Sequence, residues 1–286
     1  MAVSDFEIGT LRAEELGDAD ALVREAGWNQ IEADWRIFLE LGTVYAVRDK
    51  GRVIATAAVL PYGGRFAWIS MVLIAGYYRR QGLGTRLVQH CVRDLTGKGL
   101  VPVLDATPAG RDVYLGLGFR DSFGYRRLLL SGGKIVPSLA NGITVEAISD
   151  SSWHELCAYD SAIFGADRGK VLARLRGRLP EAEFCVWRGG HIVGFLMGRM
   201  GRRAAQLGPL VAESCEIACA LLAQALETVS APVYIDFVDG NKPLTARFLA
   251  TAGFAPERPL TRMLYGRSDA FQDVAQSYAV IGPEFG

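Results

Sequence analysis

The sequence predicts an α/β protein with a mixed sheet, in which segments of strand and helix character alternate along 286 residues. Apolar runs of strand length alternate with amphipathic segments of helical length. One strand runs directly into the turn Gly82-Leu83-Gly84, which opens a helix. A hairpin glycine is followed by a Gly-Phe pair twice, from Gly51 to Gly118 and from Gly190 to Gly253, over nearly equal lengths. This repetition predicts two related domains.

Composition narrows the class of protein. Half of the residues are hydrophobic, enough for two cores of ordinary size. Lys plus Arg equals Asp plus Glu at 31 each, so charge favours neither nucleic acid nor a membrane surface as partner. The 5 cysteines have no CxxC spacing, and no long apolar run or leader-like start is present. We therefore expect a soluble, cytoplasmic protein with reduced thiols and no metal site.

The first half has the predicted order β-α-α-β-β-β-α-β-α-β. Short apolar or alternating runs predict strands, and apolar residues at helical spacing predict helices. In chain order the predicted elements cover residues 6–11, 13–25, 31–39, 43–48, 53–59, 67–74, 83–97, 100–105, 108–117 and 126–130. A helix between two strands is the β-α-β crossover that returns the chain to the same sheet.

The turn at Gly82 is suited to binding phosphate. The first amides of a helix have no intrahelical acceptor, the helix dipole is positive there, and glycine lets a ligand approach the backbone closely. A dinucleotide-binding fingerprint would need a third small residue where this chain has Leu87, and it would follow the first strand of the chain. Asp105 meets the requirement for a downstream acidic residue, but Arg79 and Arg80 precede the glycines and the turn comes after three strands. These departures disfavour a dinucleotide-dependent reductase.

The stretch Arg79-Arg80-Gln81-Gly82-Leu83-Gly84 resembles the pyrophosphate loop of the GNAT superfamily, the GCN5-related acyl-CoA-dependent N-acyltransferases. That loop has Gln or Arg, two residues, Gly, any residue, then Gly or Ala. The order of elements over roughly residues 5–131 is similar too. The resemblance implies an acetyl-CoA-dependent N-acetyltransferase that acts on a primary amine of a small molecule or peptide by direct attack in a ternary complex.

The resemblance also implies site residues. Tyr114 stands four residues before a Gly-Phe pair, where GNAT domains place a tyrosine whose hydroxyl points at the coenzyme sulfur. We therefore expect Tyr114 to be the catalytic acid, although a packing tyrosine would show the same pattern. The residues expected to bind acetyl-CoA as co-substrate are Met71, Val72, Leu73, Arg79, Arg80, Gln81, Gly82, Leu83, Gly84 and Thr85. Binding along residues 71–73 requires their strand to splay from its neighbour.

The acceptor side is less distinct in the sequence. In GNAT proteins the connection between the first two helices forms part of the acceptor wall, and here it contains aromatic and polar side chains. The candidate acceptor-side residues are Trp28, Asn29, Asp34, Asp160, Asp167 and Arg168. Packing alone would equally explain the aromatic residues, and no carboxylate stands out as a general base. An acyl-CoA-binding sensor or scaffold without turnover is therefore the alternative function.

The second half repeats the element order. Its predicted elements cover residues 143–147, 151–159, 170–176, 184–187, 192–199, 204–210, 213–228, 233–238 and 242–252. The glycine-loop position holds Gly208-Pro209 and then Glu213, which would repel phosphate, and Leu249 aligns with Tyr114. This half resembles the C-terminal half of bacterial tandem GNAT proteins. We predict a catalytic GNAT domain in residues 1–133 and a second, non-catalytic GNAT-like domain in 134–286 that helps to wall the acceptor pocket.

Overall fold

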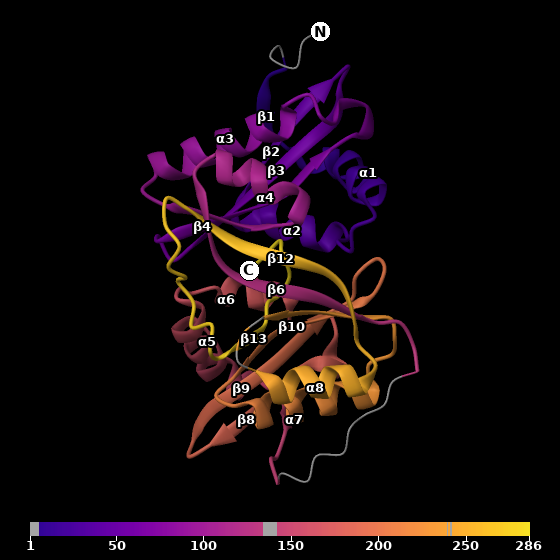
Figure 1. The fold of residues 1–286 in the computed structure, drawn as a ribbon, viewed down its shortest axis with the longest axis vertical. Helices are drawn as coiled ribbons and strands as arrows, with labels where there is room; N and C mark the ends of the chain where they lie inside the picture. Colours follow the sequence, from indigo (N-terminus) through magenta and orange to yellow (C-terminus); the bar gives the residue numbers. More distant parts are fainter. Residues whose placement is uncertain (1–5, 134–141, 239, 241) are drawn as a thin grey trace.

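The computed structural model describes residues 6–133, 142–238, 240 and 242–286 (Figure 1). The first half follows the predicted order of elements, with ends that differ by a few residues. Its elements are β1 Ile8–Thr10, α1 Leu16–Ala26, α2 Glu32–Leu41, β2 Thr43–Asp49, β3 Arg52–Tyr62, β4 Phe66–Ile74, α3 Leu83–Gly97, β5 Val101–Ala106, α4 Pro108–Gly116 and β6 Phe119–Leu130. Strand β6 is longer than predicted, because it begins immediately after Gly118.

The second half repeats this order and ends in two strands that were not predicted from the sequence. Its elements are β7 Glu146–Ala147, α5 Asp150–Phe164, α6 Gly169–Leu175, β8 Phe184–Arg188, β9 His191–Arg199, β10 Ala205–Ala212, α7 Cys215–Thr228, β11 Val233–Val238, α8 Pro243–Ala252, β12 Ala255–Tyr265 and β13 Ser277–Ala279. The unpredicted strands are β12, which is the counterpart of β6, and β13, which follows the repeated elements. No helix in the described ranges is long and apolar enough to cross a lipid bilayer.

The two halves share one sheet. The 13 strands of the described residues lie in the order β1-β2-β3-β4-β5-β12-β6-β11-β13-β10-β9-β8-β7. Strand β12 of the second half is inserted between β5 and β6, and β6 pairs with β11 of the second half along residues 125–130. Figure 1 shows these two long strands crossing the middle of the molecule. The predicted domain boundary, after residue 133, lies next to residues 134–141, which are outside the described ranges. Strands β12 and β6 each pair with strands of the other half.

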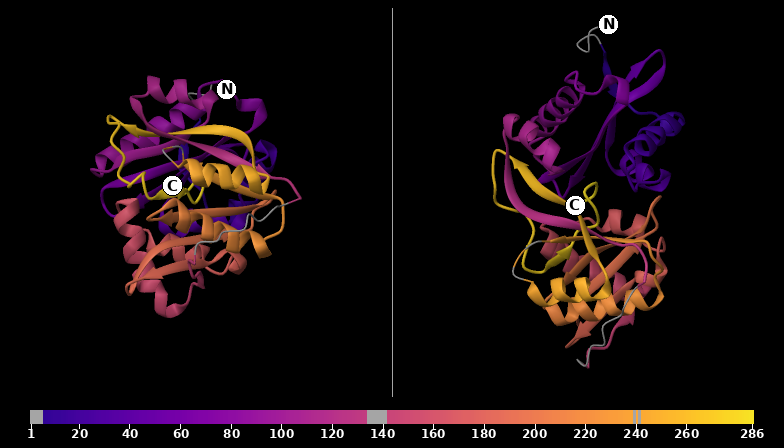
Figure 2. Two further views of the ribbon diagram at one scale, coloured as in Figure 1. Left: turned by 60° about the horizontal axis from the view of Figure 1, so that its bottom comes forward. Right: turned by 45° about the vertical axis from the view of Figure 1, so that its right-hand side comes forward.

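The hydrophobic core on one face of the sheet also belongs to both halves. Helices α1 and α2 of the first half and α5 and α6 of the second contribute to one cluster, with Trp35, Phe38, Leu156 and Leu172 almost fully buried. Helix α3 packs on the other face of the first half, and α7 and α8 form a separate cluster in the second. Figure 2 shows helices on both sides of the sheet of the first half. Because burial of apolar surface is the main stabilising term, neither half has a complete core alone.

Candidate active site

The glycine turn forms an open anion site at the start of α3. Gly82 is the N-cap residue, with a φ of 86°, and it is exposed to solvent. A Cβ added to Gly82 would meet no atom within 4 Å, so the space beside its backbone is open. The first amides of α3 have no intrahelical acceptor, and Arg79 and Arg80 line the space beside the turn. The Arg79 guanidinium donates to the Ile74 carbonyl at 2.8 Å and pairs with Glu25 at 3.2 Å, which leaves some of its N–H groups for a ligand. This is the donor set that a diphosphate requires.

Strand β4 separates from β5 just before this turn. The two strands pair in parallel only from Phe66 with Val101 to Trp68 with Val103, so β4 beyond residue 68 has no partner on that side. A ligand that pairs along residues 71–73 would require such a separation of the two strands. On its other side, the pairing of β4 with β3 shifts at Met71, whose φ is 50°, and the Thr56 hydroxyl donates to the Met71 carbonyl at 2.8 Å. The resulting bulge interrupts the β3–β4 ladder beside this gap.

A cavity of about 240 Å³, the loop cavity, lies between the glycine turn and α4. Its lining residues come from the end of β4, the turn, the first residues of α3 and the length of α4. They are Val72, Ile74, Tyr78, Arg79, Arg80, Gly82, Leu83, Gly84, Thr85, Gly110, Val113 and Tyr114. Of the residues predicted to bind a coenzyme, Met71, Leu73 and Gln81 are not part of this lining. The Gln81 amide instead donates to the Tyr77 carbonyl at 2.8 Å.

A second cavity of about 150 Å³, the central cavity, lies where the two halves meet. The first half contributes the loop before α2, the bulged part of β4, the end of β5 and α4, and the second half contributes β12 and the segment after β13. The lining residues are Trp28, Gln30, Ile69, Ser70, Met71, Val72, Leu104, Asp105, Thr107, Tyr114, Arg258, Leu260, Pro283 and Glu284. Val72 and Tyr114 line both cavities, so the loop cavity and the central cavity adjoin at the splay.

Tyr114 stands at this junction. It projects from α4 and packs edge to face on Phe119, with ring centroids 6.0 Å apart. Burial raises the pKa of its phenol above the ordinary value, which keeps the hydroxyl protonated near neutral pH. A protonated hydroxyl facing a ligand cleft can donate a proton to a leaving group.

The wall of the central cavity is rich in polar groups that lack partners. Among the described residues, four buried polar atoms without a hydrogen bond belong to side chains of this wall: Gln30 Oε1, Ser70 Oγ, Arg258 Nε and Glu284 Oε2. Burying such a group without a partner costs roughly 1–3 kcal/mol. Their convergence on one cavity is typical of a site that binds a polar ligand.

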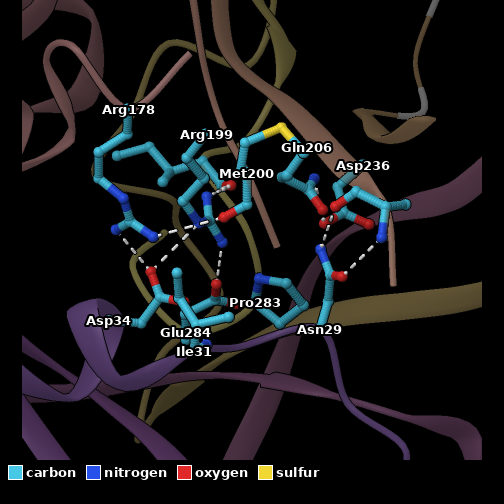
Figure 3. Close-up of polar contacts among 12 residues, drawn as sticks. Asn29, Ile31, Asp34, Arg178, Arg199, Met200, Gln206, Asp236, Pro283 and Glu284 are labelled. Atoms are coloured by element: carbon cyan, nitrogen blue, oxygen red, sulfur yellow. Dashed lines mark hydrogen bonds and ion pairs between the residues drawn. The ribbon is translucent and has the colours of Figure 1, made fainter. Parts of the chain in front are cut away.

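Glu284 is the most deeply buried of these groups, with 2% of the residue exposed. Its Oε1 forms an ion pair with Arg199, which is also bound to Asp34 at 3.4 Å (Figure 3). Burial raises the pKa of the Glu284 carboxyl, Arg199 opposes this rise, and Asp34 adds to it. Asp105, the other carboxylate of the wall, has both oxygens engaged by Arg262 at 2.9 Å. No cluster of His, Cys, Asp and Glu able to hold a metal ion occurs within the described ranges.

Comparison with known proteins identifies the family. The profile of the acetyltransferase (GNAT) family matches residues 12–119, and that of an acetyltransferase (GNAT) domain matches residues 156–279. The chain belongs to the GNAT superfamily. Its two GNAT domains are arranged in tandem, and membership supports acyl transfer in general, with acetyl-CoA as the usual co-substrate of the family.

Similar proteins agree with this assignment. The uncharacterized N-acetyltransferase YitH of Bacillus subtilis is 23% identical over 98% of this chain and 98% of its own length. A putative acetyltransferase from Pyrococcus horikoshii has a TM-score of 0.77 at 20% identity, over 98% of this chain and 96% of that one. A tandem GNAT protein from the clavulanic acid biosynthesis pathway has a TM-score of 0.65 at 17% identity, over 93% and 100%. The structural similarities show the shared tandem GNAT fold.

Most of the predicted acceptor residues lie outside the central cavity of this GNAT protein. Trp28 lines it, but Asn29 is turned into the contact between the halves, where its side chain accepts from the Arg203 and Ala204 amides and donates to the Ala204 carbonyl. Asp34 caps α2 through the Ile31 amide and pairs with Arg178 at 2.8 Å (Figure 3). These two polar groups hold the halves together.

The candidate acceptor residues of the second half also lie outside the lining of the central cavity. Asp160 and Arg168 form a buried two-bond ion pair, with both distances 2.8 Å, and Arg168 also donates to the Gly286 carbonyl. Asp167 accepts from the Gly169 amide at the start of α6. The second half contributes to the central cavity through Arg258, Leu260, Pro283 and Glu284. Sequence reasoning missed Gln30, Ser70, Arg258 and Glu284.

The second GNAT half has a filled cleft where the first has an open one. Strands β10 and β11 pair in parallel from Ala205 to Leu207 and then separate, as β4 and β5 do. Strand β13 enters this gap, pairing with β10 at Leu210 and with β11 at Phe237. At the turn before α7, Glu213 pairs with Arg188 at 3.3 Å. The protein's own chain therefore occupies the space that is a cleft in the first half.

Proposed function

We propose that this protein is an acetyl-CoA-dependent N-acetyltransferase, which moves the acetyl group from the coenzyme thioester to a primary amine by direct attack in a ternary complex. One observation carries the proposal: an open, cationic loop cavity and a polar central cavity adjoin at the splay of β4 and β5, with Tyr114 in the wall of both. A two-substrate reaction without a covalent enzyme intermediate needs such a pair of adjoining sites.

The residues of the loop cavity suit a coenzyme A diphosphate. Backbone amides at the start of α3 would bind it, Arg79 and Arg80 would add charge, and the open side of Gly82 would let it approach. The pantetheine arm would lie in the gap beside residues 71–73, pairing with the unpaired edge of β4 as an added strand does. The thioester would then reach the junction of the two cavities.

The chain's groups at the junction supply what amide formation from a thioester requires. The carbonyl oxygen gains negative charge during attack, and a backbone N–H of the β4 bulge would stabilise it. The departing thiolate has an ordinary pKa of about 8.5, so proton donation by Tyr114 assists its departure. The central cavity, of about 150 Å³ and closed by the second half, favours a small-molecule amine over a peptide.

Coenzyme A would bind to the first half alone. Strand β13 fills the gap between β10 and β11, and Glu213 stands at the turn where a diphosphate would lie. A buried strand with hydrogen bonds on both sides is not displaced by a ligand without unfolding part of the sheet. The second half would therefore act by completing the sheet and the acceptor site.

Two measurements test the proposed function. Calorimetry should show one acetyl-CoA bound per chain, and release of free thiol should occur with at least one member of a panel of small primary amines. Binding without thiol release from any amine would favour the alternative, an acyl-CoA sensor. Absence of coenzyme binding would refute both functions.

A further inference from the structure

The 280–286 segment links the filled cleft of the second half to the central cavity. It leaves β13 and crosses to the first half, where its carbonyl groups accept hydrogen bonds from buried side chains. Trp68 donates to the Pro283 carbonyl at 3.1 Å and Tyr62 to the Phe285 carbonyl at 2.7 Å. The Phe285 ring stacks on Phe38 with centroids 5.0 Å apart. Glu284 is thus held on both sides by anchored neighbours.

We propose that Glu284 is the general base of the reaction, accepting the proton of the acceptor amine before that amine attacks the thioester. This inference rests on the proposed function and adds to it the residue that receives the proton. It also gives the second half a direct part in catalysis, because the chain that follows β13 carries the base from the filled cleft of the second half to the site of the first half.

The two carboxylate oxygens of Glu284 have different surroundings. Oε1 is bound by Arg199, which also donates to the Ile281 carbonyl at 2.7 Å, so this oxygen is fixed in place. Oε2 is buried without a hydrogen-bond partner among the described residues, on a side chain of the cavity wall. A fixed carboxylate with one oxygen free of hydrogen bonds, on a residue that lines a ligand cavity, can accept a proton from an amine bound there.

The charged groups around Glu284 come from several elements. Arg199 of β9 and Arg127 of β6 favour the carboxylate, whereas burial and Asp34 of α2 disfavour it, and the Gln30 side chain stabilises the charged form. Burial is the largest of these effects and raises the pKa of the carboxyl. A base with a raised pKa is better matched to an ammonium group than an ordinary carboxylate. Asp105 is already bound through both oxygens to Arg262, so Glu284 is the better-placed carboxylate of this wall.

Glu284, Tyr114, the two substrates and solvent account for every proton and electron pair that moves in the reaction. An alkylammonium, with an ordinary pKa of about 10.4, passes one proton to Glu284 and becomes a neutral amine. The nitrogen lone pair forms the C–N bond to the thioester carbonyl, the C–S bond then breaks, and sulfur leaves with the bonding pair. The nitrogen loses its second proton to solvent as the amide forms, Tyr114 protonates the thiolate and takes a proton back from solvent, and Glu284 releases its proton to solvent, so that one proton is released per amide formed.

The test compares two amines and two variants in the full chain. The amines are the alkylamine that the wild type acetylates fastest and an arylamine of similar size, which is already uncharged near neutral pH. Glu284→Gln should lower kcat/KM for the alkylamine by roughly 10²–10⁴-fold and the arylamine rate far less, because the arylamine needs no deprotonation before attack. A merely structural role would lower both rates equally. Glu146→Gln, at an exposed position of β7, is the matched control and should change neither.

The pH profile gives a second readout. In the wild type, kcat/KM for the alkylamine should rise with pH through the pKa of Glu284, above the ordinary glutamate value of about 4.3, because only the carboxylate accepts a proton. Glu284→Gln should remove this rise and leave acetyl-CoA affinity unchanged. If the Gln variant does not fold, Glu284→Asp should keep the rise with a lower plateau. A rise that persists in a folded Gln variant, an unchanged plateau in the Asp variant, or equal losses for both amines would overturn the assignment; a wild type that acetylates no amine would instead refute the proposed function.

Discussion

Replacing Gly82 by alanine tests whether the turn before α3 binds the coenzyme diphosphate. The left-handed conformation at Gly82, with a φ of 86°, costs an alanine about 1–2 kcal/mol. No atom lies within 4 Å of the added Cβ, so no clash adds to this cost. The methyl group would occupy the open side of the turn, where the diphosphate is proposed to approach. Loss of one charge-assisted hydrogen bond of about 1.5–3 kcal/mol weakens binding roughly 10- to 100-fold.

Gly99→Ala is the matched control for this variant. Gly99 lies just beyond the other end of α3 and has a φ of 72°, and a Cβ added there would also meet no atom within 4 Å. Both variants should therefore lower the melting temperature by a similar amount, about 2–4 °C for each kcal/mol. Calorimetry with acetyl-CoA should show weakened binding for Gly82→Ala alone. Equal affinities in the two variants would refute the assignment of the diphosphate to this turn.

Three further predictions concern the junction and the contact between the halves. Tyr114→Phe should lower kcat roughly tenfold to several hundredfold and leave the acetyl-CoA Kd nearly unchanged, since the hydroxyl acts on the leaving thiolate; a large loss of affinity at normal turnover would contradict this role. Ser70→Ala should raise the KM for the amine about 2- to 10-fold without lowering the urea midpoint, because the buried hydroxyl has no partner in the described part of the protein. A lowered urea midpoint with a normal KM would instead assign Ser70 to packing. Asp34→Ala leaves Arg178 and Arg199 without this carboxylate and should lower the free energy of unfolding by roughly 3–5 kcal/mol. Both halves should still unfold in one urea transition, and separate transitions for the two halves would contradict the shared core.

The parts of the fold that depend on local sequence were predictable. The glycine turn, α3 and the β2–β3 hairpin at Gly51 have strong local patterns, and the structure has them at the expected places. Strand β12 was missed because Pro256, Arg258 and Pro259 interrupt its pattern, and its partners β5 and β6 lie far away in the sequence. Strand β13 has only 3 residues and forms because it fills a gap between two other strands.

The acceptor site was harder to predict than the fold, because its residues come from segments far apart in the sequence. Asn29 and Asp34 were selected as polar residues near an aromatic loop, but their partners Ala204 and Arg178 belong to the other half. Glu284 follows Gly282-Pro283 in a stretch without periodicity, so nothing local marks it as buried. The signal exists only in three dimensions, where the unpartnered oxygen of a buried carboxylate lies on the wall of a cavity.

A crystal structure of the protein with coenzyme A tests the central claim most directly. We predict density for the diphosphate on the amides of residues 82–85, the pantetheine arm between β4 and β5, and the sulfur beside Tyr114, with β13 still in place between β10 and β11. Coenzyme A bound in the second half, or a coenzyme that leaves the gap between β4 and β5 empty, would contradict it.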